Sequence, residues 1–506
     1  MKCIAPVLFV LIFSTSLSAQ KIIYSDIIRE DNPEINFEIL GKVGVNYVIY
    51  KNVRWKHMLA IYNENMILKE NARINFIPDK TFNIDFILYP DFFYMVYQYQ
   101  KNNTIWCKAV KLSNSGKKLS EPVTLDTSRL RLVADRKIYN TVFSEDKKHI
   151  LVYKMQRKND NLSLVTKLYD AEFNLKDSTR QPLPFDFRRD IYSDIVVDNS
   201  GTFLFTKEYR TGKFDNVNKL DVYIRQPLKD TFTQFPVSLQ EKYIDEVKIK
   251  IDNLNNNYIL NSLFSKERSG DIHGLFTGVI ERNNPQQIRT AFNMFSDSMR
   301  SQINSQEKFS NAFNNLFLRN TIVKKDGGFL ITAEDYYTQA TSSASNMRRY
   351  DNLYNSPYYS NYDYYLNSPS YSGFYRPLNS GFYVQSLRYY YDDIVILSVD
   401  SSLQLKWNSF IHKKQVEDEQ DNFLSYASVN AGGEIHFLFS DSKKTQVINN
   451  HSILPGGQIK RYATLKSYEA GYEFMPKLAK QVGARQVLIP CLYKGSIAFA
   501  KIDFSN

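Results

Sequence analysis

The sequence predicts an all-β protein, organised as a single closed β-propeller of seven or eight four-stranded blades. Polar turns followed by short apolar strands recur along the chain, and a second strand–turn–strand pattern follows each of them. The pairs of patterns return at a step of roughly 50–57 residues, the size of one propeller blade. Aromatic residues make up 14% of the chain, and they suit half-buried pleated surfaces.

The first pattern is a polar turn before an apolar run. It occurs at residues 145–148, 198–201, 255–257, 326–328 and 432–433. Asp, Asn and Gly supply the turn chemistry, because Gly and Asn tolerate a positive φ. The short apolar runs after these turns predict buried strands.

The second pattern is an apolar strand, a turn that starts with Asp or Asn, and another strand. It occurs at residues 61–68, 112–119, 168–175 and 398–405, with looser copies near Pro227, Asn284 and Ala470. The C-terminal residues 485–504 hold only two strands, so residues 21–28 are expected to complete the last blade and remove its exposed edge. Two or three β-sandwiches are the alternative, but the regular step favours one ring.

The N-terminus predicts export. Lys2 precedes the apolar run of residues 4–13, and residues 14–19 are mostly small or polar. This run is too short to span a bilayer, which needs about 20 residues, but it fits a signal peptide over residues 1–19. Cleavage is expected after Ala19 or Ser18, and an uncleaved anchor is the alternative. We expect no transmembrane segment after the signal peptide, and a periplasmic or extracellular location.

Charge and cysteine content give weaker constraints. The formal net charge is +11, with basic residues spread along the chain. This favours a mixed solvated surface over binding to anionic surfaces such as phosphate-rich glycans, lipid headgroups or nucleic acid. Beyond Cys3, the chain has Cys107 and Cys491, fewer than a disulfide-stapled exported protein would carry. Cys491 lies in an apolar run, so we expect a buried thiol, with a Cys107–Cys491 bridge as the alternative.

Two insertions interrupt the repeat inside residues 20–506. Residues 296–318 lose strand character, Ser296 or Asp297 could cap a helix, and Met299, Ile303, Phe309, Phe313 and Leu316 follow helical spacing. This predicts a short helix packed against the propeller.

The second insertion is a long Tyr-rich loop at residues 338–391, between strands expected at 329–333 and 393–399. Residues 336–391 contain 15 of the 36 tyrosines. Tyr with Ser, Gly and Asn is the composition of adaptable binding loops, and of low-complexity segments without a partner. The candidate binding residues are Tyr358, Tyr359, Tyr362, Tyr364, Tyr365, Tyr371 and Tyr375.

No local catalytic, metal or cofactor signature is present. The six histidines form no H-x-H or H-E-x-x-H pair, and there is no G-x-S-x-G elbow or C-x-x-C pair. The acidic residues 417–421 lack the ligand spacing of a calcium loop, so we interpret them as a solvated turn. Accordingly we predict no catalytic, cofactor or metal residues.

One short segment resembles a known family. The strand at 394–399, Asp400 and Trp407 resemble the strand–Asp–turn–Trp element of quinoprotein-type propellers. Leu403 stands near the place of the family's usual Gly, and the spacing is one residue short. The chain has only three Trp, so the element does not recur with Trp. The resemblance supports a propeller, and it does not support a quinone cofactor.

These observations predict an exported, monomeric, non-enzymatic binding or scaffold propeller of the bacterial cell envelope, with a protein or glycan as its partner. A structural component of a secretion or surface assembly is a related interpretation. The alternative function is a glycan-acting hydrolase, with carboxylates from different blades gathered at the central funnel.

Overall fold

The structure is a computed structural model, and it describes most of the chain outside the N-terminus and the Tyr-rich insertion. The described residues are 21–28, 35–53, 55–129, 137–158, 161–186, 189–212, 215–303, 312–340, 374–375, 387–441, 444–466 and 471–504. Nearly all of the regular structure in these residues is antiparallel β-strand. No helix among them is long and apolar enough to span a membrane.

The strands form antiparallel units of four strand positions, one of which is split between two short strands in some units, and we number the units in chain order. Unit 1 contains β2 (Asn36–Val43), β3 (Asn46–Val53), β4 (Lys56–Tyr62) and β5 (Leu68–Arg73). Unit 2 contains β6 (Thr81–Leu88), β7 (Phe92–Lys101), β8 (Thr104–Ser113) and β9 (Val123–Arg129). Unit 3 contains β10 (Asn140–Phe143), β11 (His149–Lys158), β12 (Asn161–Asp170) and β13 (Leu175–Pro184).

Units 4 and 5 are hydrogen-bonded to each other through the short strand β19 (Tyr243–Ile244). Unit 4 contains β14 (Asp190–Tyr192), β15 (Val196–Val197), β16 (Phe203–Arg210), β17 (Val217–Arg225) and β18 (Thr233–Val237), with β14 and β15 both paired to β16. Unit 5 contains β20 (Lys248–Asp252), β21 (Asn257–Ser265), β22 (Gly274–Glu281) and β23 (Asn284–Met294).

The remaining units carry the irregular parts of the fold. Unit 6 contains β24 (Leu316–Val323), β25 (Phe329–Ala340), β27 (Leu387–Val399), β28 (Leu405–Ile411) and β29 (Gln415–Asp418). Unit 7 contains β30 (Ala427–Ala431), β31 (Glu434–Asp441), β32 (Lys444–Ile453), β33 (Ile459–Arg461) and β34 (Leu465–Lys466). Unit 8 contains β35 (Tyr472–Phe474), η3 (Pro476–Leu478), β36 (Lys480–Gly483), β37 (Gln486–Tyr493), β38 (Ser496–Asp503) and β1 (Lys21–Tyr24).

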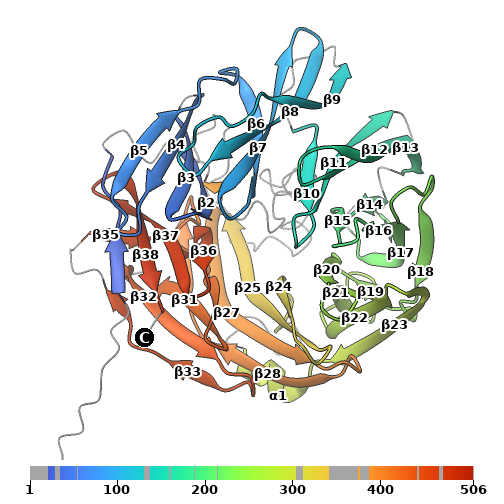
Figure 1. Cartoon of the computed structure of the whole chain (residues 1–506). Coiled ribbons are helices and arrows are strands. Elements are labelled where there is room, and N and C mark those ends of the chain that lie inside the picture. The colour runs from blue at the N-terminus through green and yellow to red at the C-terminus, as the bar shows by residue number, and fades with distance from the viewer. Residues whose placement is uncertain are drawn as a thin grey trace, which may run out of the picture.

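The units follow one another around a common centre, with β2, β10, β20 and β36 on the inside (Figure 1). The chain therefore has a β-propeller repeat fold. In each antiparallel unit, the first and third turns lie at one end of the sheet, which we call the inner-turn end. The second turn and the connection to the next unit lie at the other end, which we call the hairpin end.

Buried apolar side chains join the consecutive units. Separate clusters bridge units 1 and 2, 2 and 3, 3 and 4, 4 and 5, 5 and 6, 6 and 7, and 7 and 8. A further cluster joins unit 8 to unit 1, with Phe499 of β38 packed edge-on against Phe37 of β2. Burial of apolar area at about 25 cal/mol per Å² makes these contacts the main stabilising term.

The turn patterns seen in the sequence are confirmed. Asp170 shows the chemistry, since its Oδ1 accepts hydrogen bonds from the backbone N–H groups of Glu172 and Asn174. Phe173 then takes a positive φ of 62°. Leu403 takes the same place after Asp400, with φ 64° and a buried side chain. A non-glycine residue is tolerated there because packing of its side chain offsets the strain.

One copy of this turn was missed. In unit 7 it lies at residues 454–458, where Leu454 replaces the Asp or Asn, and its backbone N–H bonds to the carbonyl of Gln458 at 3.0 Å. The expected copy near Ala470 falls at residues 467–470, outside the described residues. At Gly457 of this turn, a Cβ atom would lie 2.8 Å from the ring of Trp407 in unit 6. The ring of Trp407 thus occupies the space that the buried side chains of Phe173 and Leu403 fill in the corresponding turns of units 3 and 6.

The two ends of the chain share unit 8, as expected from the missing strand. β1 pairs antiparallel with β38, and Lys21 lies opposite Asp503. The backbone N–H of Ser25 extends the pairing by a 2.8 Å bond to the carbonyl of Phe499. The expectation of a buried thiol is also confirmed. Cys107 on β8 and Cys491 on β37 are both buried and free, and they lie in different units.

Both expected insertions are shorter than predicted. The helix α1 (Asp297–Gln302) is capped by Ser296, whose Oγ accepts from the N–H of Met299 at 3.2 Å. Strand pairing resumes already at Leu316, opposite Asp335, because Leu316 belongs to the apolar cluster between units 5 and 6. Residues 338–340 and 387–391 are paired strand ends of β25 and β27 and not loop, since tyrosines pair well across strands.

Candidate functional site

The candidate binding tyrosines lie mostly outside the described residues. This holds for Tyr358, Tyr359, Tyr362, Tyr364, Tyr365 and Tyr371. The backbone of Tyr375 is described: with Phe374 it forms β26 (Phe374–Tyr375), which pairs with the inner edge of β2. Tyr375 lies opposite Phe37, and Phe374 lies opposite Glu38. The insertion of unit 6 therefore comes back to the first strand of unit 1.

The stem of the insertion is an aromatic ladder on the long hairpin of β25 and β27. Tyr337 and Tyr390 stack with ring centroids 4.4 Å apart, and Tyr336 and Tyr391 lie 4.7 Å apart. Phe317 of β24 meets Tyr336 edge-on at 5.8 Å. Such pairs add to the stability of a hairpin beyond simple burial, so the stem is a rigid support at the hairpin end.

A buried ionic cluster holds the base of this stem. Lys413 Nζ lies 2.9 Å from Glu334 Oε1, and both side chains are fully buried. Arg319 Nη2 and Ser425 Oγ approach the other carboxylate oxygen at 3.0 and 2.7 Å. Burial alone would raise the pKa of Glu334, but Lys413 and Arg319 together lower it. The carboxylate is therefore held ionised, and it ties β24, β25 and the entry to unit 7 together.

A second group of charged side chains, which we call the axial cluster, comes from the innermost segments of several units. It consists of Glu38 on β2, Asp85 on β6, Lys137 before β10, Asp194 between β14 and β15, Glu246 and Lys248 at the start of β20, and Lys480 on β36. Neighbouring first strands contact one another, as β2 does with β6 and β36 (Figure 1). Lys137 Nζ lies 3.0 Å from Asp85 Oδ1, and Lys248 pairs with Glu246.

Two carboxyl groups of the axial cluster have strongly shifted pKa values. Burial raises the pKa of Glu38 to about 7, against the opposing effect of Lys480. Burial likewise raises the pKa of Asp194 to about 7, opposed by Lys248 and reinforced by Glu246. Among the described residues, neither carboxyl forms an ion pair. Carboxyl groups that hold a proton near neutral pH can donate hydrogen bonds or act as general acids.

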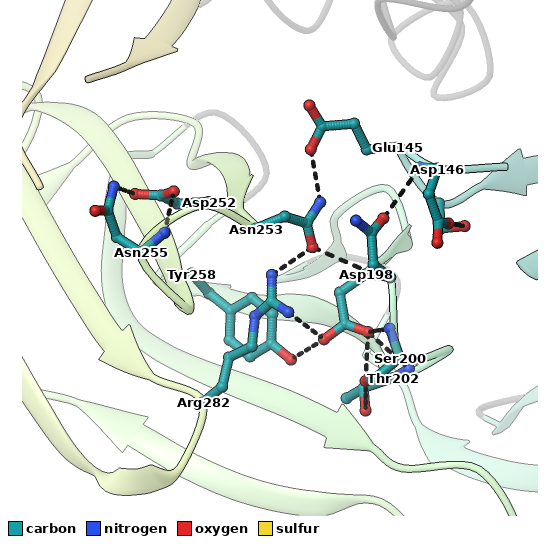
Figure 2. A network of polar contacts seen from close by, with 12 residues as sticks. Glu145, Asp146, Asp198, Ser200, Thr202, Asp252, Asn253, Asn255, Tyr258 and Arg282 are labelled. Carbon is teal, nitrogen blue, oxygen red and sulfur yellow. Dashed lines mark hydrogen bonds and ion pairs between the residues drawn. The ribbon is translucent and has the colours of Figure 1, made fainter. Parts of the chain in front are cut away.

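The inner turns of units 3, 4 and 5 are joined by the polar network in Figure 2. Asn199 Oδ1 accepts from the N–H of Asp146, and Asn253 Oδ1 accepts from the N–H of Asn199. Asn253 Nδ2 then donates to Glu145 Oε2 at 2.7 Å, which spans from unit 5 to unit 3. These hydrogen bonds cross the turn of unit 4, and they hold the inner turns of units 3, 4 and 5 together.

The centre of the network is the buried carboxylate of Asp198. Its Oδ2 accepts from Tyr258 at 2.8 Å and lies 3.3 Å from Arg282 Nη1 (Figure 2). Its Oδ1 accepts from the N–H groups of Ser200 and Thr202. Every oxygen of Asp198 is therefore used within the protein, and the network is a structural link between units rather than an open site.

The acidic residues 417–421 and His436 also form contacts within the protein. Asp418 pairs with Arg388 at 2.6 Å, and Asp421 pairs with Lys477, so the acidic turn is bound to basic side chains. His436 Nδ1 lies 2.9 Å from Asn450 Oδ1 inside unit 7. Among the described residues, no group of three or more His, Cys, Asp or Glu side chains could hold a metal ion.

Sequence reasoning named none of the axial residues. Each is a single charged residue in or beside the first strand of its unit, and the repeat brings them together only in space. A usable signal was present: Glu38 and Asp85 stand among apolar residues, in segments that form the first strands of their units. Charged residues in such strands mark an axial site once the repeat is recognised.

Comparison with known proteins finds similar structures but no matching sequence. No protein-family model and no curated protein sequence matches the chain. The WD40 domain of SCAP from fission yeast aligns with a TM-score of 0.40 and 10% identity, covering 96% of this chain and 94% of that one. A prolyl endopeptidase aligns with a TM-score of 0.43 and 7% identity, covering 92% of this chain and 55% of that one.

A third similar structure is the polysaccharide lyase Uly1. It aligns with a TM-score of 0.41 and 9% identity, covering 83% of this chain and 89% of that one. The fold assignment rests on the strand pairing described above.

Proposed function

We propose that units 1 to 8 are the blades of one closed propeller. The support is the pairing of β1 with β38 and the apolar cluster between units 8 and 1. We further propose that residues 1–19 are an export signal and that the mature protein works in the periplasm or at the cell surface. Mass spectrometry of the protein from its native envelope tests this, with a chain that starts at Gln20 or Ala19 as the expected result.

The function we propose is that of a non-enzymatic binding or scaffold protein of the bacterial cell envelope, with a protein or glycan as its partner. The observation that carries it is the way in which the Tyr-rich insertion is attached to units 6 and 1. Its stem is an extended hairpin, fixed at the base by the buried Glu334–Lys413 pair, and it returns to β2 beside the axial cluster. A large, Tyr-rich segment on a rigid support combines adaptable contacts with low entropic cost.

Deletion of the insertion tests this function. Residues 341–386 are replaced by a short Gly-Ser linker, which leaves the paired ends Ala340 and Leu387 in place. We expect a folded protein, with thermal unfolding lowered only by the loss of the short β26 pairing, and loss of association with envelope fractions and surface glycans. Leu228→Ser, at an exposed turn of the inner-turn end, is the matched control and should associate normally. Association that survives the deletion would overturn the proposal.

A second candidate function is a glycan-acting hydrolase at the centre of the ring. The observation in its favour is that burial raises the pKa of Glu38 and of Asp194 to about 7. Either group could therefore serve as the protonated acid that glycosidases use together with an ionised carboxyl group. Depolymerisation of envelope polysaccharides is compared for the wild type, Glu38→Gln and Asp194→Asn. Activity that falls at least about 100-fold in either variant would favour the enzyme, and equal activity in all three would reject it.

A further inference from the structure

Three cations surround the ring of Tyr391, where the stem of the insertion meets units 7 and 8. Arg319 Cζ lies 5.7 Å from the centroid of this ring, Lys413 Nζ lies 5.8 Å away, and Lys477 Nζ lies 5.4 Å away. Arg319 comes from β24, Lys413 follows β28, and Lys477 belongs to η3 of unit 8. Cations are attracted to the face of an aromatic ring, so Tyr391 brings positive charge from two units to one place.

Two carboxylates share this place with the cations. Glu334 pairs with the two cations of unit 6, as described above. Asp421 accepts from the phenol of Tyr391 at 2.6 Å and pairs with Lys477. Burial alone would raise the pKa of Asp421, but the neighbouring cations, Lys477 foremost, lower it. The acids therefore fix the cations in position by ion pairs.

The cations reach the surface more than the acids do. The side chains of Arg319 and Lys477 are 33% and 34% exposed. The side chain of Glu334 is fully buried, and that of Asp421 is 24% exposed. The ammonium of Lys477 has three N–H donors, and among the described residues two are used, by Asp421 and Tyr391. The third is available to a group outside the chain, on a side chain that the ion pair already holds in place.

We propose that Lys477 and Arg319 form a subsite for the acid group, carboxylate or sulfate, of an acidic glycan at the base of the Tyr-rich insertion. This inference deepens the proposed binding function, on which it rests, because it names the class of partner. Lys477 donates a hydrogen bond to the acid group, and Arg319 adds a second positive charge beside the same ring. Charge-assisted hydrogen bonds of this kind are the strong ones in proteins.

The acidic turn beside the subsite favours a glycan over an acidic protein segment. Asp421 ends this turn, and Asp418 within it pairs with Arg388. Glu417 and Glu419 form no ion pair among the described residues. A peptide with clustered acids would be repelled by these two carboxylates. An acidic glycan in which charged and neutral sugars alternate can place a neutral ring there.

Calorimetric titration of the full mature chain tests the subsite. The acidic ligands are a hyaluronan tetrasaccharide, which carries carboxylates, and a keratan sulfate tetrasaccharide, which carries sulfates. Chitotetraose is the neutral control, and a blocked Glu-Gly-Glu peptide represents an acidic protein segment. We expect at least one acidic tetrasaccharide to bind and neither control to do so, with affinity that falls between about 0.05 M and about 0.3 M salt. The tetrasaccharide that binds identifies the acid group.

Two variants of the subsite should shift this affinity in opposite directions. Lys477→Met removes the ammonium and should weaken binding at least about tenfold. Asp421→Asn removes a competing negative charge and should tighten binding about threefold or more. The matched controls Lys325→Met and Asp326→Asn lie on the exposed turn between β24 and β25, at the other end of unit 6, and should bind like the wild type. Near-ultraviolet circular dichroism checks that each variant is folded.

Failure of both acidic tetrasaccharides to bind would overturn the proposal. So would equally tight binding of chitotetraose or of the peptide, or a Lys477→Met variant that binds like Lys325→Met. Should one of the two subsite variants not fold, the direction of the change in the other decides. The subsite lies outside residues 341–386, so the deletion variant retains it, and the proposed function and this inference can fail separately.

Discussion

Lys413 and Glu334 form an ion pair of 2.9 Å in which neither side chain reaches solvent. Glu334 lies on β25, and Lys413 lies between β28 and β29 of the same unit. The pair is completed by Arg319 from β24 and by Ser425 at the entry to unit 7. Charges are costly to bury, so this arrangement is stable only while all partners are present.

Removal of the Lys413 side chain should therefore lower the free energy of unfolding strongly. In Lys413→Met, Glu334 keeps Arg319 but loses its closest cation, and we expect a loss of about 3–5 kcal/mol in the free energy of unfolding. The double variant Glu334→Leu with Lys413→Met should recover much of this loss, since it leaves no lone acid. Urea unfolding followed by tryptophan fluorescence measures both.

The exposed pair Arg388–Asp418 provides the control for that experiment. Its side chains are 45% and 54% exposed, so Arg388→Met should cost less than about 1 kcal/mol. A Lys413→Met variant no less stable than Arg388→Met would contradict the structural role of the buried pair.

Asp198 makes a similar prediction for the inner-turn end. Asp198→Asn keeps the shape of the side chain but removes the charge that faces Arg282 and accepts from Tyr258 (Figure 2). We expect a loss of about 2–4 kcal/mol, because a buried cation is left without its counter-ion. Asp326→Asn, at a corresponding but exposed turn, should change stability by less than about 1 kcal/mol. Equal unfolding midpoints for the two variants would exclude a linking role for Asp198.

The sequence reveals the strands and turns of this fold because their signals are local. An Asp such as Asp170 caps its own turn, and the apolar run that follows sits in the same stretch of chain. The missed turn at Leu454 shows the limit, since its backbone geometry is the same but the capping side chain is absent. The strand ends at Ala340 and Leu387 were missed because tyrosines suit strands and binding loops equally well.

The charged clusters could not be predicted from local sequence patterns in the same way. Lys413 is 79 residues from Glu334, and Lys137 is 52 residues from Asp85, as their hydrogen bonds and numbering show. Neither separation corresponds to a helical or strand neighbour, so no motif joins the partners. Strand pairing within unit 6 brings Lys413 to Glu334. The packing of unit 3 beside unit 2 brings Lys137 to Asp85.

Glu208 makes the stability of the protein depend on pH. It is buried on β16, and burial, reinforced by Glu246, raises its pKa from 4.5 to about 8. The folded state thus holds the proton more tightly than the unfolded state does. The stabilisation is fully present below the unfolded pKa of 4.5 and is lost as the pH rises through about 8.

We therefore expect the free energy of unfolding to fall by a few kcal/mol between pH about 5 and about 9. Glu208→Gln, which cannot ionise, should reduce this fall, whereas Glu121→Gln on an exposed turn should not. Urea midpoints measured across this range decide the matter, and a Glu208→Gln profile parallel to that of the wild type would count against the buried acid.

Tyr24 fixes the strand that joins the two ends of the chain. Its ring stacks on Tyr472 of β35 at 4.0 Å, and Tyr472 stacks on Tyr493 of β37 at 4.1 Å. In Tyr24→Ala the stack loses its outer ring and β1 loses one of the side chains that anchor it, so we expect about 2–4 kcal/mol of destabilisation. Ile27→Ala removes an apolar side chain that is 43% exposed in the segment after β1 and should cost less than about 1 kcal/mol.

Because β1 closes unit 8, limited proteolysis should also cut the Tyr24→Ala variant faster than the Ile27→Ala variant. Identical cleavage rates and unfolding midpoints would mean that the ring of Tyr24 does not help to hold the ends of the chain together.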